Sequence, residues 1–185
     1  MKWRNDAERY GILSILLHWL MLLLIVGVYS CIELRGYWPE GSAIREGMKT
    51  WHFMLGLSIF SLVWLRLALR RSAPSPLIAP PLPHWQHRLA RAIHFALYAF
   101  MIAMPLGGWI MLSAADKPIP FWGLELPPLV APSKDLAKQV KELHETIGVA
   151  GYALIGLHAT VGLIHHYVRR DNTLLRMLPI VRSTR

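Results

Sequence analysis

Two histidines on the last hydrophobic stretch of the chain, residues 143–166, are spaced as ligands of a flat metal cofactor could be. His144 and His158 are fourteen residues apart. On a helix this spacing corresponds to about 21 Å along the axis and about 40° around it, so both rings lie on one side. An imidazole inside a bilayer is costly and generally faces a partner, a cavity or a cofactor. The spacing therefore favours two haems bound at two depths of a membrane.

Glycines recur on the same stretch and leave its surface without side chains. We interpret them as room for a wide, planar group to lie against the backbone. They are Gly148, Gly151, Gly156 and Gly162.

Two further histidines, His18 and His52, lie on other hydrophobic stretches. In an up-and-down bundle that starts inside the cell, His18 and His158 share the inner half of the membrane, and His52 and His144 share the outer half. We therefore expect two axial pairs, because bundles build cofactor sites from inward-facing side chains on neighbouring helices. Two imidazoles leave iron without an open position, which favours electron transfer over oxygen binding.

The elements that must position these histidines are four long apolar runs. The chain has 185 residues, of which 54% are hydrophobic, and each run reaches the ~20 residues that a helix needs to cross a bilayer. We predict helices over about 10–31, 49–71, 87–112 and 141–168. The expected fold is an all-α integral membrane protein, a four-helix up-and-down bundle that forms a single domain over residues 1–185.

The net charge of +9 is unevenly distributed. Lys and Arg are in surplus at both termini and in the connection between the second and third helices, whereas the other two connections are close to neutral. The positive-inside rule then places both termini in the cytoplasm. The basic surplus orients the chain in the membrane, and nothing beyond it indicates a nucleic-acid partner.

The remaining candidate ligands narrow the type of cofactor. Cys31 is the single cysteine and no Cys-x-x-Cys-His sequence occurs, so the haems are expected to be non-covalent haem b. Zinc is disfavoured because it needs three or four converging ligands, whereas these histidines separate into two levels. His94 lies near the inner surface, which favours an interface residue over an axial ligand or a propionate partner. His165 and His166 have no assigned role.

The chain resembles the bacterial cytochrome b561 family over nearly its whole length. Single motifs are short, but their order and spacing are together fairly specific. The motifs are His18-Trp19, Glu33-Leu34-Arg35-Gly36 with Pro39, His52, His144-Glu145-Thr146, Gly156-Leu157-His158-Ala159, His165-His166-Tyr167, and Asp171-Asn172-Thr173-Leu174-Leu175-Arg176-Met177 with Pro179.

This resemblance implies the same axial pairs and a function. The family members are small di-haem proteins of the bacterial inner membrane, and their best-described activity oxidises superoxide at the periplasmic face and delivers the electrons to ubiquinone. Arg35 and Lys141 match basic positions of the family, which implies a role near the substrate. The expected partners are thus superoxide or another small donor, quinone, and the lipid membrane.

Two other functions remain open from the sequence. The chain could be the cytochrome b anchor of a larger dehydrogenase and pass electrons between that partner and the quinone pool. It could also be a haem-free transporter lined by histidines, although such a protein normally carries acidic residues at mid-depth, and the hydrophobic stretches contain none there.

Overall fold

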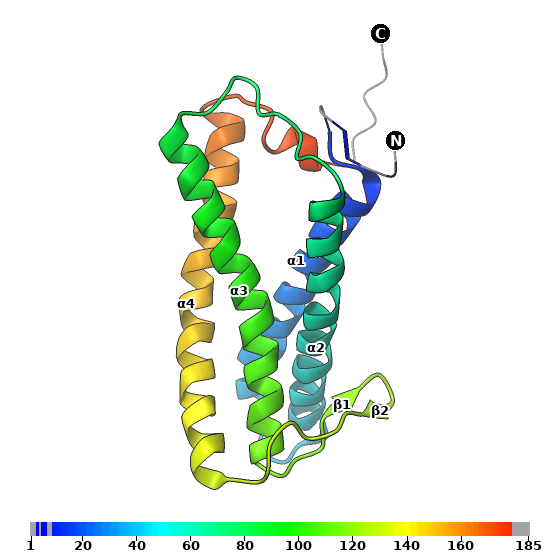
Figure 1. Ribbon diagram of the computed structural model, residues 1–185. Helices are drawn as coiled ribbons and strands as arrows, with labels where there is room; N and C mark the ends of the chain where they lie inside the picture. Colours follow the sequence, from blue (N-terminus) through cyan, green and yellow to red (C-terminus); the bar gives the residue numbers. More distant parts are fainter. Residues whose placement is uncertain (1–2, 4, 7–8, 179–185) are drawn as a thin grey trace. The chain divides into compact units, whose positions relative to one another are not determined.

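The computed structural model describes residues 3, 5–6 and 9–178, and Figure 1 shows these as predominantly helical. Pro179, the last residue of the family motif, lies outside the described residues. Each long helix in the described residues is apolar enough to cross a membrane, which confirms the predicted class. These helices are α1 (Ile12–Leu34), α2 (Ala43–Ser72), α3 (His84–Ala114) and α4 (Lys134–Tyr167).

Three of the helices begin earlier than their hydrophobic runs. α2 begins at Ala43 rather than near 49, because Ser42 caps it and accepts a hydrogen bond from the Arg45 N–H at 3.4 Å. Ser133 caps α4 in the same way, with the Leu136 N–H 3.3 Å from its hydroxyl. These first turns are polar and solvent-exposed, so a search for apolar runs misses them. The predicted starts at 49, 87 and 141 were therefore too late.

The helices contribute to two compact units, which we describe separately. Unit 1 comprises residues 1–20, 64–98 and 152–185, and unit 2 comprises residues 21–63 and 99–151. The α2–α3 connection belongs to unit 1, whereas the α1–α2 and α3–α4 connections belong to unit 2. This alternation agrees with the predicted up-and-down order of the helices.

In unit 1, the C-terminal tail fastens the proline-rich connection between α2 and α3. The side chain of Asn172 accepts a hydrogen bond from the Ala79 N–H at 3.0 Å and donates one to the Leu77 carbonyl at 3.3 Å. Arg176, on the short 3-10 helix η2 (Leu175–Met177), donates to the Pro76 carbonyl. The connection between Ser72 and His84 has no helix, and the described part of the tail binds to it.

In unit 2, the α3–α4 connection contains a β-hairpin that its proline content did not predict. β1 (Pro120–Phe121) and β2 (Leu124–Glu125) pair antiparallel around Trp122 and Gly123. Both turn residues have positive φ, 49° and 86°, which is the backbone of a tight hairpin turn. The Trp122 indole N–H donates to the Ser58 hydroxyl of α2 at 2.9 Å, so the hairpin is tied to the helix that carries His52.

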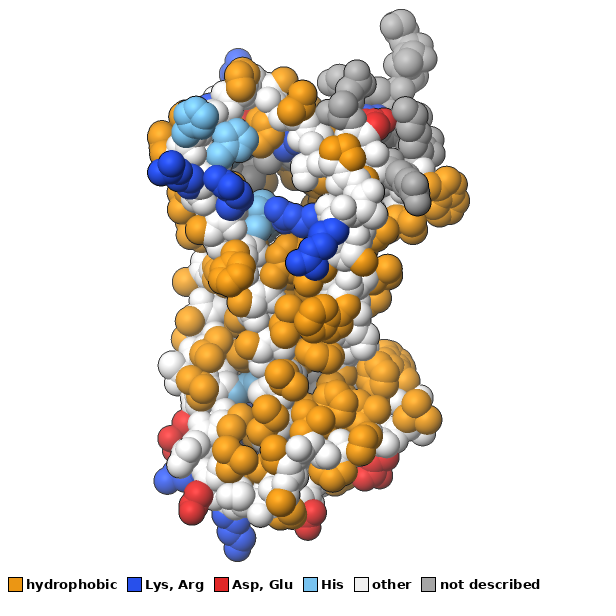
Figure 2. All heavy atoms as spheres, viewed as in Figure 1, with side chains coloured by type: hydrophobic (Ala, Val, Ile, Leu, Met, Phe, Trp, Pro, Cys, Tyr) orange, Lys and Arg blue, Asp and Glu red, His pale blue; other side chains and the backbone are white. Residues whose placement is uncertain are grey.

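A small buried cluster joins the hairpin region to the helices of unit 2. Leu57 of α2, Leu112 of α3 and Ile119 before β1 are each less than a tenth exposed. Most other large apolar side chains on these helices are only partly buried and some are exposed, and hydrophobic side chains cover much of the face in Figure 2. A helix that is apolar all round and partly exposed is typical of contact with lipid.

Candidate functional site

The first histidine pair lies in unit 1, where α1 presents His18 and α4 presents His158. Their ring centres are 6.3 Å apart and the rings are inclined by 75°. Both side chains are partly buried. The structure therefore brings together the two histidines that the sequence paired by depth.

The second pair lies in unit 2 and joins α2 to α4. The ring centres of His52 and His144 are 6.4 Å apart, with 68° between the ring planes. Nδ1 of His52 lies 3.0 Å from the carbonyl oxygen of Val28. Because a carbonyl can only accept, Nδ1 carries the proton, and the lone pair of Nε2 remains available to a metal.

Both separations fit two imidazoles on opposite sides of one iron. Metal–imidazole bonds of about 2 Å place the ring centres of such a pair about 6 Å apart. His94 is the other histidine near His158, and their ring centres are only 5.4 Å apart. This distance is shorter than trans ligation requires, so His18 fits better than His94 as the partner of His158. No group of three or more metal-ligating side chains occurs within the described part of the chain.

The glycines of α4 differ in what surrounds them. A Cβ on Gly151 would overlap the Tyr29 hydroxyl and the Phe100 ring, and Tyr29 donates a hydrogen bond to the Gly148 carbonyl at 2.7 Å. Gly156 is exposed with no atom near its missing Cβ. The interpretation of Gly151 as room for a planar cofactor was therefore wrong, because side chains of α1 and α3 fill that space.

Two glycines of α3 were missed by the sequence interpretation. A Cβ on Gly107 or Gly108 would lie 3.6 Å from the ring of His144, so the backbone of α3 runs directly beside that imidazole. They follow Pro105, which lies inside α3. The Pro-Gly-Gly spacing within a hydrophobic run is the signal that could have found this close approach.

The other histidines have different surroundings. His94 is half-buried and lies beside His158. Nδ1 of His165 lies 2.6 Å from Oδ2 of Asp171, which assigns His165 to fastening the tail. His166 packs edge-on against Tyr167, with ring centres 4.7 Å apart. His84 and His87 are exposed in the first turn of α3.

Asp171 is a buried carboxylate outside the membrane-spanning helices. Burial alone raises its pKa, but hydrogen bonds from Thr173 and His165 outweigh that effect and hold the pKa below its ordinary value. The Thr173 N–H donates to Oδ1 at 2.9 Å. Asp171 therefore stays ionised and fixes the start of the tail.

Arg66 is a further residue beside the site, and the sequence alone did not single it out. Its Nη2 lies 3.0 Å from Nδ1 of His18, and its Nε donates to the Tyr98 hydroxyl at 3.2 Å. Arg66 follows His52 by fourteen residues on α2, the same spacing that separates His144 from His158 on α4. This repeated spacing is the signal that could have found it.

The two basic residues predicted near a substrate are in unit 2. Arg35 begins the short 3-10 helix η1 (Arg35–Tyr37) and is partly buried. Lys141 forms an ion pair with Glu145 at 3.3 Å, and both side chains are more than half exposed. Exposed ion pairs of this kind contribute little to stability, so Lys141 remains available to solvent.

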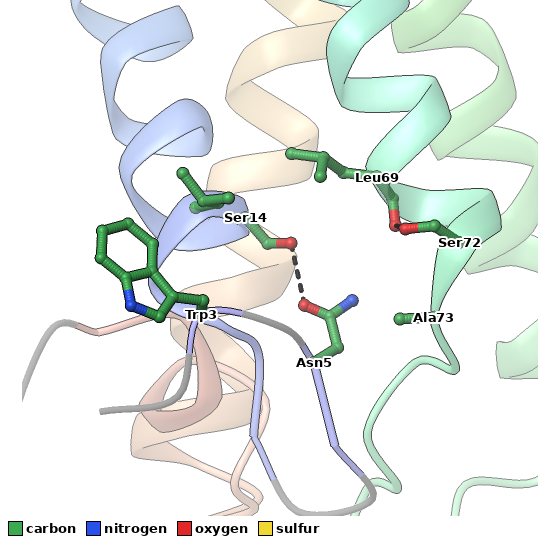
Figure 3. Close-up of a pocket in the computed structure, with 7 residues that line it drawn as sticks. Trp3, Asn5, Ser14, Leu69, Ser72 and Ala73 are labelled. Carbon is green, nitrogen blue, oxygen red and sulfur yellow. Dashed lines mark hydrogen bonds between the residues drawn. The ribbon is translucent and has the colours of Figure 1, made fainter.

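The described residues also form a pocket in unit 1 that contains none of the paired histidines. Figure 3 shows Trp3, Asn5 and Ser14 on one side and Leu69 and Ser72 of α2 on the other. The Ser14 hydroxyl donates to Oδ1 of Asn5 at 2.8 Å. The pocket is thus separate from the candidate site.

Membrane-spanning helices that carry two such histidine pairs define a membrane cytochrome of the b type. Residues 9–179 match the family described as "Prokaryotic cytochrome b561", and the chain belongs to this family. It therefore binds b-type haem and is a multi-pass bacterial membrane protein for transmembrane electron transfer.

Curated relatives match almost end to end. "Cytochrome b561 homolog 1" of Escherichia coli (strain K12) is 37% identical over 172 residues, which cover 93% of this chain and 98% of the relative. "Probable superoxide oxidase CybB" of Yersinia pestis is also 37% identical over 172 residues, with 93% and 97% covered. "Cytochrome b561 homolog 2" of Escherichia coli (strain K12) is 28% identical over 183 residues, with 96% and 95% covered. These relatives make the chain an oxidoreductase of the same family.

Proposed function

We propose that this chain is a superoxide:ubiquinone oxidoreductase that holds two haem b groups, one between His18 and His158 and one between His52 and His144. The observation that carries the proposal is the pair of ring-centre separations, 6.3 and 6.4 Å, each between a histidine of α4 and one of another helix. Bound haem supplies one-electron redox chemistry, and the protein supplies ligands and surroundings. The whole chain, residues 1–185, acts as one domain in this proposal.

The residues around each pair have distinct tasks. The Val28 carbonyl orients His52 through Nδ1, and such an outer contact also raises the basicity of a ligating ring. Gly107 and Gly108 leave room for the His144 ring beside α3. These contacts hold the second pair ready for a planar group.

The reaction balances as follows. Two superoxide anions each lose one electron and leave as dioxygen, while ubiquinone takes up two electrons and two protons to form ubiquinol. The name of the Yersinia pestis relative, probable superoxide oxidase, supports this choice of donor. Quinone is soluble in the bilayer, where the spanning helices can meet it.

Arg35 and Lys141 attract the anionic donor in this proposal. Arg35 belongs to the same compact unit as His52, and Lys141 is solvent-accessible although Glu145 offsets part of its charge. Basic groups beside a site increase the rate at which small anions arrive and make that rate salt-dependent. The positive-inside rule places these residues on the periplasmic side of a bacterial inner membrane, with both termini in the cytoplasm.

Counting haem per chain tests the cofactor part of the proposal. A reduced-minus-oxidised spectrum of the purified protein should give two b-type haems per polypeptide, and His158→Ala should lower this to one or fewer. His166→Ala is the matched control, because His166 is a half-buried histidine of the same helix outside both pairs. One haem in the unaltered protein, or two in His158→Ala, would contradict the assignment.

Stopped-flow reduction tests the donor. We expect superoxide to reduce the bound haem rapidly, and Arg35→Gln and Lys141→Gln to slow this step while dithionite still reduces the haem fully. Fast reduction by dithionite with none by superoxide would remove the donor and leave the cytochrome. Copurification with a flavin or iron–sulfur subunit would instead support an anchor of a larger dehydrogenase.

A further inference from the structure

Arg66 is a charged side chain in a membrane-spanning helix, and no acidic side chain of the described residues pairs with it. Its Nε donates to Tyr98 and its Nη2 contacts His18, whereas Nη1 is buried without a hydrogen-bond partner. No carboxylate of the described residues forms an ion pair with it. A guanidinium in such surroundings is costly unless an anion compensates it.

The contact with His18 is incompatible with ligation of iron through Nε2. A neutral imidazole that binds a metal through Nε2 carries its proton on Nδ1, and that N–H must then donate. The guanidinium also has only donors. The 3.0 Å contact between Nη2 and Nδ1 therefore requires the opposite tautomer, in which Nε2 is protonated.

His52 shows the contrasting arrangement. Its Nδ1 faces the Val28 carbonyl, so the ring can bind iron through Nε2 with its outer contact intact. When His18 binds iron, by contrast, Arg66 has to leave Nδ1 and find another acceptor. Nε of Arg66 is already bound to Tyr98. The two terminal nitrogens of the guanidinium, Nη1 and Nη2, therefore become available to another acceptor.

The surroundings of Nη1 and Nη2 of Arg66 are basic. The guanidinium of Arg70 lies 5.7 Å from the centre of the Tyr98 ring, and His94 lies beside His158. On the face in Figure 2, Lys and Arg side chains gather over the end of α2 and the beginning of α3. A carboxylate suits these groups, and a guanidinium binds it through two parallel hydrogen bonds.

We propose that Arg66 binds a propionate carboxylate of the haem between His18 and His158, through Nη1 and Nη2, while Tyr98 holds its Nε. The inference rests on the proposed function for the identity of that histidine pair. The ligand chemistry is a porphyrin carboxylate, which is the acidic group that a haem b brings to this end of unit 1.

A comparison of haem with its dimethyl ester tests whether Arg66 binds a propionate or only packs against the porphyrin. The ester has the same ring but lacks both carboxylates. The background is the full chain with His144→Ala, which should leave one haem at the His18–His158 pair. The apoprotein is loaded with either porphyrin, and transfer to an excess of apomyoglobin reports the dissociation rate. Haem count in this background tests the proposed function independently, since a result other than one would refute the pairing itself.

In the His144→Ala protein, we expect the ester to dissociate at least about tenfold faster than haem, because the ester cannot form the charge-assisted hydrogen bonds. Adding Arg66→Gln should bring the two rates together by speeding the loss of haem alone. Arg71→Gln, an exposed arginine at the end of the same helix, should keep the full difference. An unchanged ratio in Arg66→Gln would overturn the proposal.

A lysine variant keeps the test possible if the glutamine variant does not bind porphyrin. If Arg66→Gln takes up neither porphyrin, the comparison is made in Arg66→Lys, which keeps the charge but not the two-donor fork. A ratio of rates below that of the background protein supports the proposal. A ratio equal to that of the background overturns it.

Discussion

Replacing Gly151 with alanine should destabilise the protein through a defined overlap. The added Cβ would collide with the Tyr29 hydroxyl and with Cζ of Phe100. Overpacking of this kind costs about 1–3 kcal/mol. Displacing the Tyr29 hydroxyl from the Gly148 carbonyl adds about 1 kcal/mol, and the better helix propensity of alanine returns about the same amount.

The net loss is therefore about 1–3 kcal/mol, which for a chain of this size corresponds to a lower midpoint of thermal unfolding by roughly 2–12 °C. The assay is thermal unfolding of the detergent-solubilised protein, followed by circular dichroism. Gly156→Ala is the matched control, because Gly156 lies on the same helix with nothing within 4 Å of its missing Cβ. We expect its midpoint to be unchanged or higher.

Tyr29→Phe separates the two contributions in Gly151→Ala. This variant loses only the hydrogen bond to the Gly148 carbonyl and should lower the midpoint less than Gly151→Ala does. Equal midpoints for Gly151→Ala and Gly156→Ala would refute the reasoning, because they would show that Tyr29 and Phe100 do not occupy the space beside Gly151.

Three further outcomes concern the C-terminal tail. Since the pKa of Asp171 is depressed in the folded protein, its contribution to stability is present at neutral pH and is lost as the pH falls through that lowered pKa. Unfolding midpoints measured from pH 7 to pH 3 should therefore fall at the acid end, and less so in Asp171→Asn. Asn172→Ala should increase deuterium uptake at Leu77, Ile78 and Ala79, which mass spectrometry can compare with uptake in the β-hairpin. Trp19→Phe removes the 2.7 Å hydrogen bond to the Met177 carbonyl and should make the tail more sensitive to protease, while an unchanged cleavage rate would count against a fastened tail.

The spanning helices and the histidine pairing could be predicted because both follow from the lengths of hydrophobic runs. A run of about 20 apolar residues is sufficient to place a helix in a membrane, and depth within that helix is sufficient to match His18 with His158 and His52 with His144. The structure brings the same rings to 6.3 and 6.4 Å. Their role as iron ligands stays a prediction until the haems are counted.

Other features depend on contacts between distant parts of the chain, which a local pattern does not contain. The bonds of Asn172 to residues 77 and 79 join the tail to a connection far away in the sequence. The sequence around Arg66 did not indicate its role, because Tyr98 and His18 come from other helices. Gly151 was interpreted as room for a planar cofactor for the same reason, because Tyr29 and Phe100, which fill that space, belong to other helices and cannot be inferred from the sequence of α4.

Both histidine pairs depend on α4, the last of the four long described helices to leave the ribosome. A nascent chain that has inserted three helices holds His18 and His52 but has no partner for either. Under the proposed pairing, loading with porphyrin must follow the synthesis of α4, and chains that terminate before α4 should remain colourless in the membrane. Supply of haem to the cell would then control how many finished chains mature, without affecting how many are inserted.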